Sequence, residues 1–410
     1  MRILAVSQYY WPEPFNVAEI CEELQSRGHE VTVLTGLPNY PEGELYPGYD
    51  SRRDMEEERN GVRVIRVADR PRHTGAVNRT INYYSFAERG KARARMLKER
   101  YDVVVAFTIS PVMSAAPANE YCRKNGVPLL NYVIDLWPEC LLAGGVKRGS
   151  LIYRHYKRTS RRIYGCADAY AITSPSFEGY LSDLLGSEIF ATYLPQFAEN
   201  MFAGGQRQEV PEGYDRKRLN LTFAGNVGSA QSVETLVIAA SILGNDPRLL
   251  FHVVGDGSEL ARCKELAARL GASNVTFHGR HDIAEMPSYY GASDAMVATF
   301  ADMPTLSLTL PRKIQSYMAA GRPVIAAAGG ETERVVKDAA CGLTSPAEDA
   351  EALARACFDF AAMPEVERSE MGARARAYYE EHYSRETFFA TLEGCLERTA
   401  CLRHGACFST

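Results

Sequence analysis

The sequence lacks the features that mark several protein classes. Its ten cysteines include no CxxC pair, so neither a zinc site nor a disulfide framework is indicated, and they fit a reducing cytosol. No apolar run reaches the about 20 residues that span a bilayer, and no signal peptide precedes the first strand-like segment. No GxGxxG follows that segment, which counts against a nicotinamide or flavin enzyme. A net charge of −5 gives no reason to expect a nucleic-acid partner. We therefore expect a cytoplasmic protein.

The chain of 410 residues exceeds what one hydrophobic core usually serves, so two domains are expected. Short apolar runs alternate with helical patterns throughout, which predicts βαβ units and parallel sheets. The fold class is therefore α/β, with two Rossmann-like domains and ligands bound at the carboxyl ends of strands in a cleft. The predicted strands are residues 3–7, 31–35, 62–67, 103–107, 129–134, 169–173, 189–193, 219–224, 250–254, 275–277, 295–299 and 323–327.

Two segments do not follow this alternation. Residues 196–218 are rich in Gly, Pro and charge and are the best candidate for a linker, which gives domains at 1–197 and 198–375 and a helical tail at 376–410. Residues 38–61 contain three prolines and no period, so we expect a long functional or disordered loop there.

The stretch from Pro304 to Ala328 predicts a polar loop, a short helix and a buried strand. Pro311 suits the first helical turn, and Gly321 suits the left-handed residue that ends a helix. Arg312 and Lys313 place two cations at the positive end of the helix dipole, which is unfavourable unless an anion binds there. The alternative is an ordinary amphipathic helix with two solvated cations.

Glycines follow three other predicted strands of the second half, in the segments 223–228, 254–257 and 277–280. Backbone can approach a diphosphate closely at such positions, so their convergence predicts a nucleotide-diphosphate site. Glu331 could contact a donor sugar or could be an acidic first-turn residue. The candidate donor-binding residues are Gly225, Asn226, Gly228, Gln231, Gly255, Asp256, Gly257, Gly279, Arg280, Ser307, Thr309, Pro311, Lys313, Ser316 and Glu331.

In the first half, Asp135 closes an apolar strand and Trp137 follows it, a pairing that suits contact with a polar ligand and stacking on a sugar. The alternative is a helix cap with a buried tryptophan. Asn16 likewise could face a ligand or cap a helix. The candidate acceptor-binding residues are Trp11, Glu13, Asn16, Tyr40, His73, Arg79 and Trp137.

Residues 149–165 carry five Arg or Lys residues against an apolar side made of Leu151, Ile152, Tyr156 and Ile163. A basic amphipathic helix of this kind can lie on an anionic membrane surface, and a plain surface helix is the alternative.

Together these motifs resemble a known family. FAGNVGSAQ, VVGDG, VTFHGR and PRKIQSYMAAGRPVIA resemble the donor half of retaining GT-B glycosyltransferases of family 4. SQYYWPEPFN, RHTGAVNRTINYYSF and VIDLWPE are similar to its bacterial O-antigen and capsule branch, typified by the L-fucosamine transferases. The resemblance covers essentially the whole chain.

This resemblance implies a nucleotide-sugar donor, with UDP the expected nucleotide, and a lipid-linked saccharide acceptor. It implies retention of the anomeric configuration, no metal and no cofactor, and last helices that cross back to the first domain. The sugar that fits this branch is an N-acetylated deoxyamino sugar such as N-acetylfucosamine. Asp135, Lys313 and Arg280 are the candidate catalytic residues.

The sequence departs from the family pattern at several positions. Other family members carry an Arg and a Lys that bind the diphosphate, and this chain has Asn226 and Gln231 near those positions. Other members also carry a pair of glutamates, which align with Leu308 and Ser316 in this chain. We expect Arg280 and Lys313 to replace the missing cations, because charge develops on the leaving diphosphate. Two alternatives stay open: a UDP-sugar epimerase of the same architecture, and an inactive nucleotide-sugar-binding scaffold.

Overall fold

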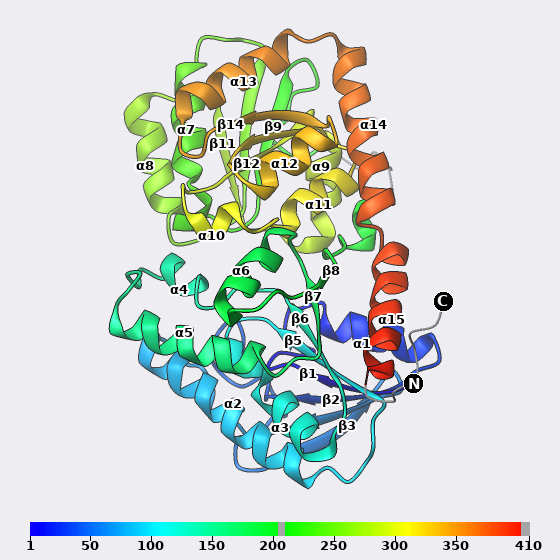
Figure 1. Cartoon of the computed structure of the whole chain (residues 1–410). Helices are drawn as coiled ribbons and strands as arrows, with labels where there is room; N and C mark the ends of the chain where they lie inside the picture. The colour runs from blue at the N-terminus through cyan, green and yellow to red at the C-terminus, as the bar shows by residue number, and fades with distance from the viewer. Residues whose placement is uncertain (204–209, 403–410) are drawn as a thin grey trace. The chain divides into compact units, whose positions relative to one another are not determined.

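A computed structural model describes residues 1–203 and 210–402 of the chain. These residues divide into two compact units, one of residues 1–194 with the segment from Phe389 onward, and one of Pro195–Phe388. The candidate linker at 196–218 includes residues 204–209, and the predicted tail includes residues 403–410, which lie outside the described residues. Figure 1 shows both units and labels many of their helices and strands.

The described part of the first unit contains an eight-stranded sheet in the order β3-β4-β2-β1-β5-β6-β7-β8. All neighbouring strands are parallel except β3 and β4, which pair antiparallel. The order reverses at β1, so the loops after β1 and β5 meet at a topological switch point, where such sheets bind ligands. The strands are β1 (Arg2–Val6), β2 (Glu30–Thr35), β3 (Met55–Arg59), β4 (Val62–Arg66), β5 (Val103–Thr108), β6 (Leu129–Val133), β7 (Ala169–Ile172) and β8 (Ala191–Tyr193).

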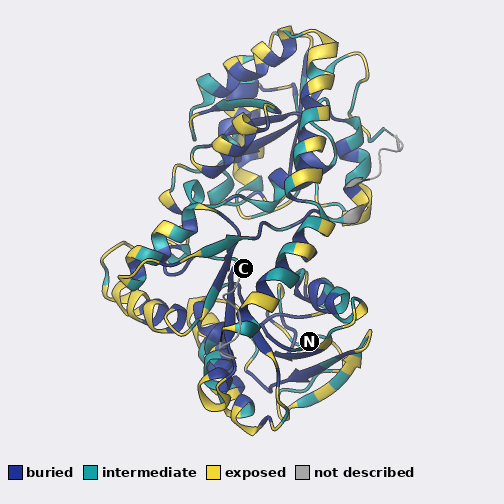
Figure 2. Cartoon of the chain, turned by 45° about the vertical axis from the view of Figure 1, so that its right-hand side comes forward, coloured by how far each residue is buried: buried dark blue, intermediate teal, exposed yellow. Residues whose placement is uncertain are grey.

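Helices cover this sheet and bury its strands from both sides. All six residues of β5 are buried, as expected for a parallel strand between helical layers. Figure 2 shows the central strands in dark blue and the outward faces of the helices in yellow, whereas the edge strands β3 and β8 contain no buried residue. The helices are α1 (Val17–Ser26), α2 (Ala76–Met96), η1 (Val112–Ala115), α3 (Ala116–Asn125), α4 (Cys140–Ala143), α5 (Leu151–Tyr164) and α6 (Ser176–Leu185).

The second unit contains a six-stranded, all-parallel sheet in the order β11-β10-β9-β12-β13-β14. Its order reverses at β9, which places a second switch point between β9 and β12. The strands are β9 (Leu219–Ala224), β10 (Leu249–Val254), β11 (Val275–Gly279), β12 (Ala295–Thr299), β13 (Val324–Ala327) and β14 (Gly342–Ser345).

One face of this sheet packs on α7, α8 and α13, whose apolar side chains form a core cluster with Phe223, Phe251 and Ile325. Helix α11 packs on the other side, where Ile314, Tyr317 and Met318 are fully buried. The helices are η2 (Asn200–Ala203), η3 (Ser229–Gln231), α7 (Val233–Ile242), α8 (Leu260–Leu270), η4 (Ile283–Glu285), α9 (Met286–Ala292), α10 (Pro304–Ser307), α11 (Arg312–Ala319), α12 (Glu331–Asp338), α13 (Ala350–Ala362) and α14 (Glu365–His382).

The last helix, α15 (Arg385–Cys401), begins in the second unit and continues in the first. Within the first unit, Glu393 of α15 accepts from Arg27 at 3.4 Å and lies 3.0 Å from the ring of His29. The guanidinium of Arg27 also lies 4.9 Å from the centroid of the Phe389 ring. These contacts attach the last helix to the segment that follows α1.

Three expectations from the sequence are corrected. The segment 38–61 is not loop throughout, because β3 forms in it as the antiparallel edge strand and keeps charged side chains on its exposed face. The expected polar loop at 304–311 contains the short helix α10. Pro311 precedes α11 as its N-cap residue with extended backbone, whereas Gly321 has the left-handed φ of +65° that the sequence predicted.

Candidate active site

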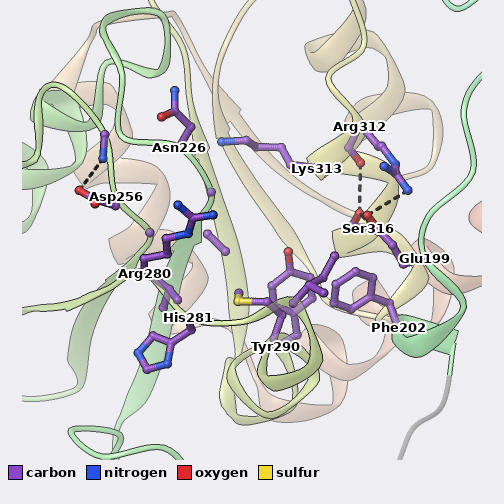
Figure 3. Close-up of a pocket in the computed structure, with 17 residues that line it drawn as sticks. Glu199, Phe202, Asn226, Asp256, Arg280, His281, Tyr290, Arg312, Lys313 and Ser316 are labelled. Atoms are coloured by element: carbon purple, nitrogen blue, oxygen red, sulfur yellow. Dashed lines mark hydrogen bonds and ion pairs between the residues drawn. The ribbon is translucent and has the colours of Figure 1, made fainter. Parts of the chain in front are cut away.

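The carboxyl ends of β9, β10 and β11 border a pocket of about 590 Å³ in the second unit (Figure 3). It lies at the switch point of the sheet, where the first residues of α11 also reach it. Its lining residues are Glu199, Phe202, Ala224, Gly225, Asn226, Val254, Gly255, Asp256, Gly257, Arg280, His281, Ile283, Met286, Tyr290, Arg312, Lys313 and Ser316.

Two glycines let backbone form the floor of this pocket. Gly225 and Gly255 have φ of +135° and +145°, a region that residues with a side chain rarely adopt. A Cβ at Gly255 would lie 1.8 Å from the carbonyl oxygen of Gly225, so the two strand ends touch through backbone alone. The floor is therefore open to a ligand that approaches the main chain.

Lys313 supplies a cation to this floor. Its Nζ is buried, has no hydrogen-bond partner among the described residues, and lies 3.2 Å from where a Cβ of Gly225 would stand. The nearest ring is Phe223, whose centroid is 4.1 Å from Nζ. Burial lowers the pKa of the Lys313 amine to about 7. A buried amine without a partner is costly, and an anion bound on the glycine floor would satisfy it.

The opposite wall holds a carboxylate. Glu199 forms an ion pair with Arg312 at 2.9 Å, and the Ser316 hydroxyl donates to its other oxygen at 3.4 Å. A carboxylate offers about four acceptor positions, so these two contacts leave room for hydroxyls of a ligand. Phe202 and Tyr290 stack beside it with centroids 4.7 Å apart. Figure 3 shows Lys313 directed toward Asn226 and Glu199 on the other side of Ser316.

The third wall is the segment after β11. Arg280 is exposed, and His281 next to it lies 2.8 Å from the hydroxyl of Tyr289 through Nε2. Across the pocket, Asn226 donates to the side chain of Gln231 at 3.2 Å. Arg280 is thus the second cation with freedom to follow a bound diphosphate.

The structure brings eight of the predicted donor-binding residues together in the pocket lining and leaves seven outside it. The residues in the lining are Gly225, Asn226, Gly255, Asp256, Gly257, Arg280, Lys313 and Ser316. The residues outside it are Gly228, Gln231, Gly279, Ser307, Thr309, Pro311 and Glu331.

The local contacts explain several of the seven. The hydroxyls of Ser307 and Thr309 donate to the carbonyls of Met303 and Thr305, as they do inside a helix. Glu331 is 5% exposed and forms a 2.6 Å ion pair with Arg334. Of the two alternatives from the sequence, this favours an acidic first-turn residue over a carboxylate that contacts a donor sugar.

Sequence reasoning missed the wall that carries Glu199, Phe202 and Tyr290. Glu199 and Phe202 lie in a stretch without periodicity that was interpreted as linker. Arg312 was recognised as a first-turn cation, but its carboxylate partner more than a hundred residues earlier leaves no local signal.

The first unit has its own pocket of about 460 Å³ at the switch point between β1 and β5. Aromatic side chains dominate its wall, with two arginines and one carboxylate among them. Its lining residues are Tyr9, Phe15, Tyr40, Arg72, Ala76, Arg79, Thr80, Tyr83, Ile109, Ser110, Asp135, Trp137, Cys140, Leu141, Gly144, Val146, Ile152 and Tyr156.

Asp135 is held at the end of β6 by backbone. Its Oδ2 accepts from the N–H of Ser110 at 2.9 Å, and the Trp137 indole donates to the Ser110 hydroxyl at 2.8 Å. Trp137 is 3% exposed and meets Tyr83 and Tyr156 edge-on, so the expectation of an open stacking surface is corrected. It borders the pocket as part of an aromatic wall.

Of the predicted acceptor-binding residues, Tyr40, Arg79 and Trp137 line this pocket, and Asp135 lies beside them. Glu13 does not line it, because it is 4% exposed and turned inward. It accepts from the backbone N–H groups of Tyr10, Asn39 and Tyr40, and burial raises the pKa of its carboxyl to about 7. Glu13 therefore fixes the loop that carries Tyr40.

Trp11, Asn16 and His73 also lie outside the lining. Trp11 is covered by the Arg59 guanidinium at 3.9 Å from its ring centroid, and His73 lies 2.8 Å from Glu44. Asn16 occupies the N-cap position of α1, the alternative noted from the sequence, although its side chain makes no capping bond.

Two absences hold for the described residues. Residues 1–203 and 210–402 contain no group of three or more His, Cys, Asp or Glu side chains that could hold a metal ion. No helix in this part of the chain has the length and apolar character needed to cross a membrane.

Comparison with known proteins identifies the domains. Residues 16–191 match the family model for the glycosyl transferase 4-like domain, and residues 218–362 match that for glycosyl transferases group 1. The chain is 26% identical over 286 residues to probable glycosyltransferase WbjE of Pseudomonas aeruginosa, covering 66% of this chain and 70% of WbjE. It is 22% identical over 352 residues to putative colanic acid biosynthesis glycosyl transferase WcaI of Escherichia coli, which covers 81% of this chain and 84% of WcaI.

Solved structures agree on the fold. Sucrose-phosphate synthase of Thermosynechococcus elongatus superposes with a TM-score of 0.74 at 19% identity, covering 97% of this chain and 98% of that one. The structure of Anabaena Alr3699/HepE in complex with UDP superposes with a TM-score of 0.67 at 15% identity, covering 97% of this chain and 100% of that one. The fold is thus of the GT-B type, and each of its two domains matches a glycosyl transferase family model.

Proposed function

We propose that the protein is a retaining glycosyltransferase that moves a sugar from a UDP-linked donor to a lipid-linked saccharide in bacterial polysaccharide assembly. The observation that carries the proposal is the buried, unpartnered amine of Lys313 above a floor of backbone glycines. The names of WbjE and WcaI, which are glycosyltransferases, the latter of colanic acid biosynthesis, support the polysaccharide context.

The diphosphate of the donor is assigned to the glycine floor. Lys313 approaches it from the start of α11, and Arg280 approaches from the end of β11. Cleavage of the glycosyl–phosphate bond leaves additional charge on the diphosphate, and two cations in a partly dehydrated pocket stabilise that charge. Lys313 and Arg280 thereby replace the Arg and Lys that other family members have at positions near those of Asn226 and Gln231 in this chain.

The nucleoside is assigned to the remaining walls. Glu199 can accept from the ribose hydroxyls, a role for which Ser316 alone is too short, and Arg312 holds that carboxylate in place. UDP as the nucleotide is supported by the related fold of Alr3699/HepE, which was solved in complex with UDP.

The acceptor is assigned to the aromatic pocket of the first unit. Sugar rings pack on aromatic side chains, and Arg72 and Arg79 suit a phosphate that links a glycan to its lipid. Asp135, anchored by the Ser110 N–H, is the carboxylate available to orient the acceptor hydroxyl. Retention follows the family pattern, in which the leaving phosphate oxygen takes the acceptor's proton, and an N-acetylated deoxyamino sugar is the proposed group transferred.

Membrane contact is proposed through the start of α5. Of the apolar side chains noted from the sequence, Leu151 and Ile152 are 77% and 57% exposed. The exposed cations of the helix are Arg154, Lys157, Arg158, Arg161 and Arg162, and its sequence has no acidic residue. Two apolar side chains among five cations suit the surface of an anionic leaflet.

This contact is tested by co-sedimentation with phosphatidylglycerol vesicles at low salt. The Leu151→Ser/Ile152→Ser variant should lose most binding, while Val366→Ser, which removes a comparably exposed side chain from α14, should bind as wild type. Absence of wild-type binding would dismiss the contact.

The nucleotide assignment is tested by calorimetric titration with UDP, GDP, dTDP and CDP. We expect preference for UDP, and loss of most binding in Lys313→Ala with the far-ultraviolet circular dichroism unchanged. Truncating one partner of a buried charge contact costs about 2–5 kcal/mol, which corresponds to a loss of about 30-fold or more. UDP affinity within a few-fold of wild type in Lys313→Ala would rule out the assignment.

A further inference from the structure

A second polar cavity of about 550 Å³ lies in the second unit, and we call it the basic pocket. It is built at the amino-terminal ends of the central strands, whereas the candidate donor pocket lies at their carboxyl ends. Strand β9, with six residues, separates the two by about 20 Å. The lining residues of the basic pocket are Arg216, Lys217, Arg218, Leu219, Arg248, Asp294, Gly321, Arg322, Pro323, Ala361, Glu365, Arg368, Ser369 and Gly372.

Positive charge is concentrated in this cavity. Six of its lining residues are arginine or lysine and two are acidic, although the chain as a whole carries a net charge of −5. Asp246, just outside the lining, neutralises Arg248 by accepting from its Nε–H through Oδ1 at 2.9 Å and from a terminal N–H through Oδ2 at 2.6 Å. Asp294 accepts from the backbone N–H of Asn220 at 2.8 Å. The remaining cations therefore outnumber the carboxylates that face them.

Backbone carbonyls hold these cations in place. Arg218 donates to the carbonyl oxygens of Pro247 and Leu249 at 2.7 and 2.9 Å. Arg322 donates to those of Ser293 and Gly291, both at 2.9 Å. A carbonyl fixes the position of a guanidinium and leaves its full charge, so these arginines are arranged before any ligand arrives.

The wall opposite the strands is α14. Arg368 is fixed in the same way, because its guanidinium donates to the carbonyl of Met363. The first turns of this 18-residue helix also bring Ser369 to the cavity, so a hydroxyl donor and the positive end of a helix dipole face it. At Gly372 a Cβ would lie 2.5 Å from the carbonyl oxygen of Gly321, which shows how closely α14 packs there. Fixed guanidiniums, a hydroxyl and a helix start together are the donors that bind phosphate.

We propose that the basic pocket is a second anion site of this protein, which binds a phosphoryl group carrying two or more negative charges. The ligand is a soluble diphosphate or the phosphomonoester headgroup of an anionic lipid such as phosphatidic acid, and both present a terminal phosphoryl group of high charge. Helix α11 links the two sites, since Lys313 stands at its start and Gly321 and Arg322 follow its end.

The experiment uses inorganic pyrophosphate and the full chain carrying Lys313→Ala, so that the donor pocket does not contribute. Calorimetry should show one site. Adding Arg216→Gln and Lys217→Gln, whose side chains are exposed and outside the core, should weaken pyrophosphate binding about 10-fold. Arg218→Gln should do the same. Arg355→Gln, which removes an exposed arginine of α13 that is not part of the cavity lining, should change the affinity less than twofold.

Vesicles of phosphatidic acid in phosphatidylcholine distinguish the two sources. Pyrophosphate binding that the pocket variants weaken, without binding to the vesicles, identifies a soluble diphosphate. Vesicle binding that persists in a Leu151→Ser/Ile152→Ser background, and that Arg218→Gln abolishes when it is added to this background, identifies a lipid headgroup. If neither probe binds, or if Arg355→Gln weakens binding as much as Arg218→Gln, the proposal is overturned. UDP binding by the Lys313-containing chain is measured separately and does not depend on this result.

Discussion

The pKa of Lys313 leads to a direct prediction about how the donor binds. Burial lowers this pKa from its usual 10.5 to about 7 in the unliganded protein. A diphosphate next to Nζ restores the charged form, so binding must be accompanied by proton uptake. At pH 8 only about 10% of the free protein carries the charge, and about 0.9 proton should therefore be taken up per UDP bound.

The affinity for UDP should consequently fall about tenfold per pH unit above pH 7. The terminal phosphate of UDP ionises near pH 6, so from pH 8 upward its own titration contributes little. Calorimetry at pH 8 in two buffers of different ionisation enthalpy measures the uptake directly. Lys313→Arg keeps a permanent charge and should remove it.

His281 is the histidine among the residues that line the pocket. His281→Gln is therefore the matched control, and its proton uptake should equal that of wild type. Uptake below about 0.2 proton per UDP in the wild-type protein, or equal uptake in Lys313→Arg, would refute the assignment of the diphosphate to Lys313.

Four further predictions follow from individual groups. Because burial lowers the pKa of Lys313 in the folded protein, the unfolded chain binds more protons than the folded one above pH 7. The free energy of unfolding measured with urea should therefore rise by about 1.4 kcal/mol per pH unit between pH 8.5 and 10. Lys313→Met should abolish that rise. Burial raises the pKa of Asp69 to about 8, so its contribution to stability is lost as pH rises from about 4 to 8, and Asp69→Asn should flatten the urea stability profile over that window. Asp135→Asn should lower turnover at least about tenfold and leave UDP affinity within twofold in calorimetry; a change in affinity alone would remove its catalytic role. Glu199→Ala should erase the preference for UDP over 2′,3′-dideoxy-UDP, about tenfold in wild type, and an unchanged ratio would show that Glu199 does not bind ribose.

Much of the fold was predictable because parallel sheets leave a strong local signal. Buried strands such as β5 and β9 are continuous apolar runs between helical patterns. The two missed strands lack that signal: β3 reads MEEER and lies at an edge, and β14 is the four-residue segment Gly342–Ser345. Their pairing depends on the neighbouring strand more than on their own composition.

The site was predictable where backbone dictates residue type. Gly225 and Gly255 lie where two strand ends touch, and only glycine fits such an approach. Glu13 and Trp137 were assigned to ligand contact, but tertiary packing buries both, which no local pattern reports. Glu199 was missed because its partner Arg312 is brought to it only by the folded chain.

The most direct test of the account is transfer itself. Purified protein is given UDP-N-acetylfucosamine and other UDP-sugars with lipid-linked saccharides extracted from a polysaccharide-producing bacterium, and the glycolipid product is analysed by mass spectrometry and NMR. The account predicts one added sugar with the anomeric configuration of the donor, and loss of product in Lys313→Ala. UDP binding without turnover on any donor would indicate the scaffold instead. A free epimer, an inverted product or full activity in Lys313→Ala would contradict the account.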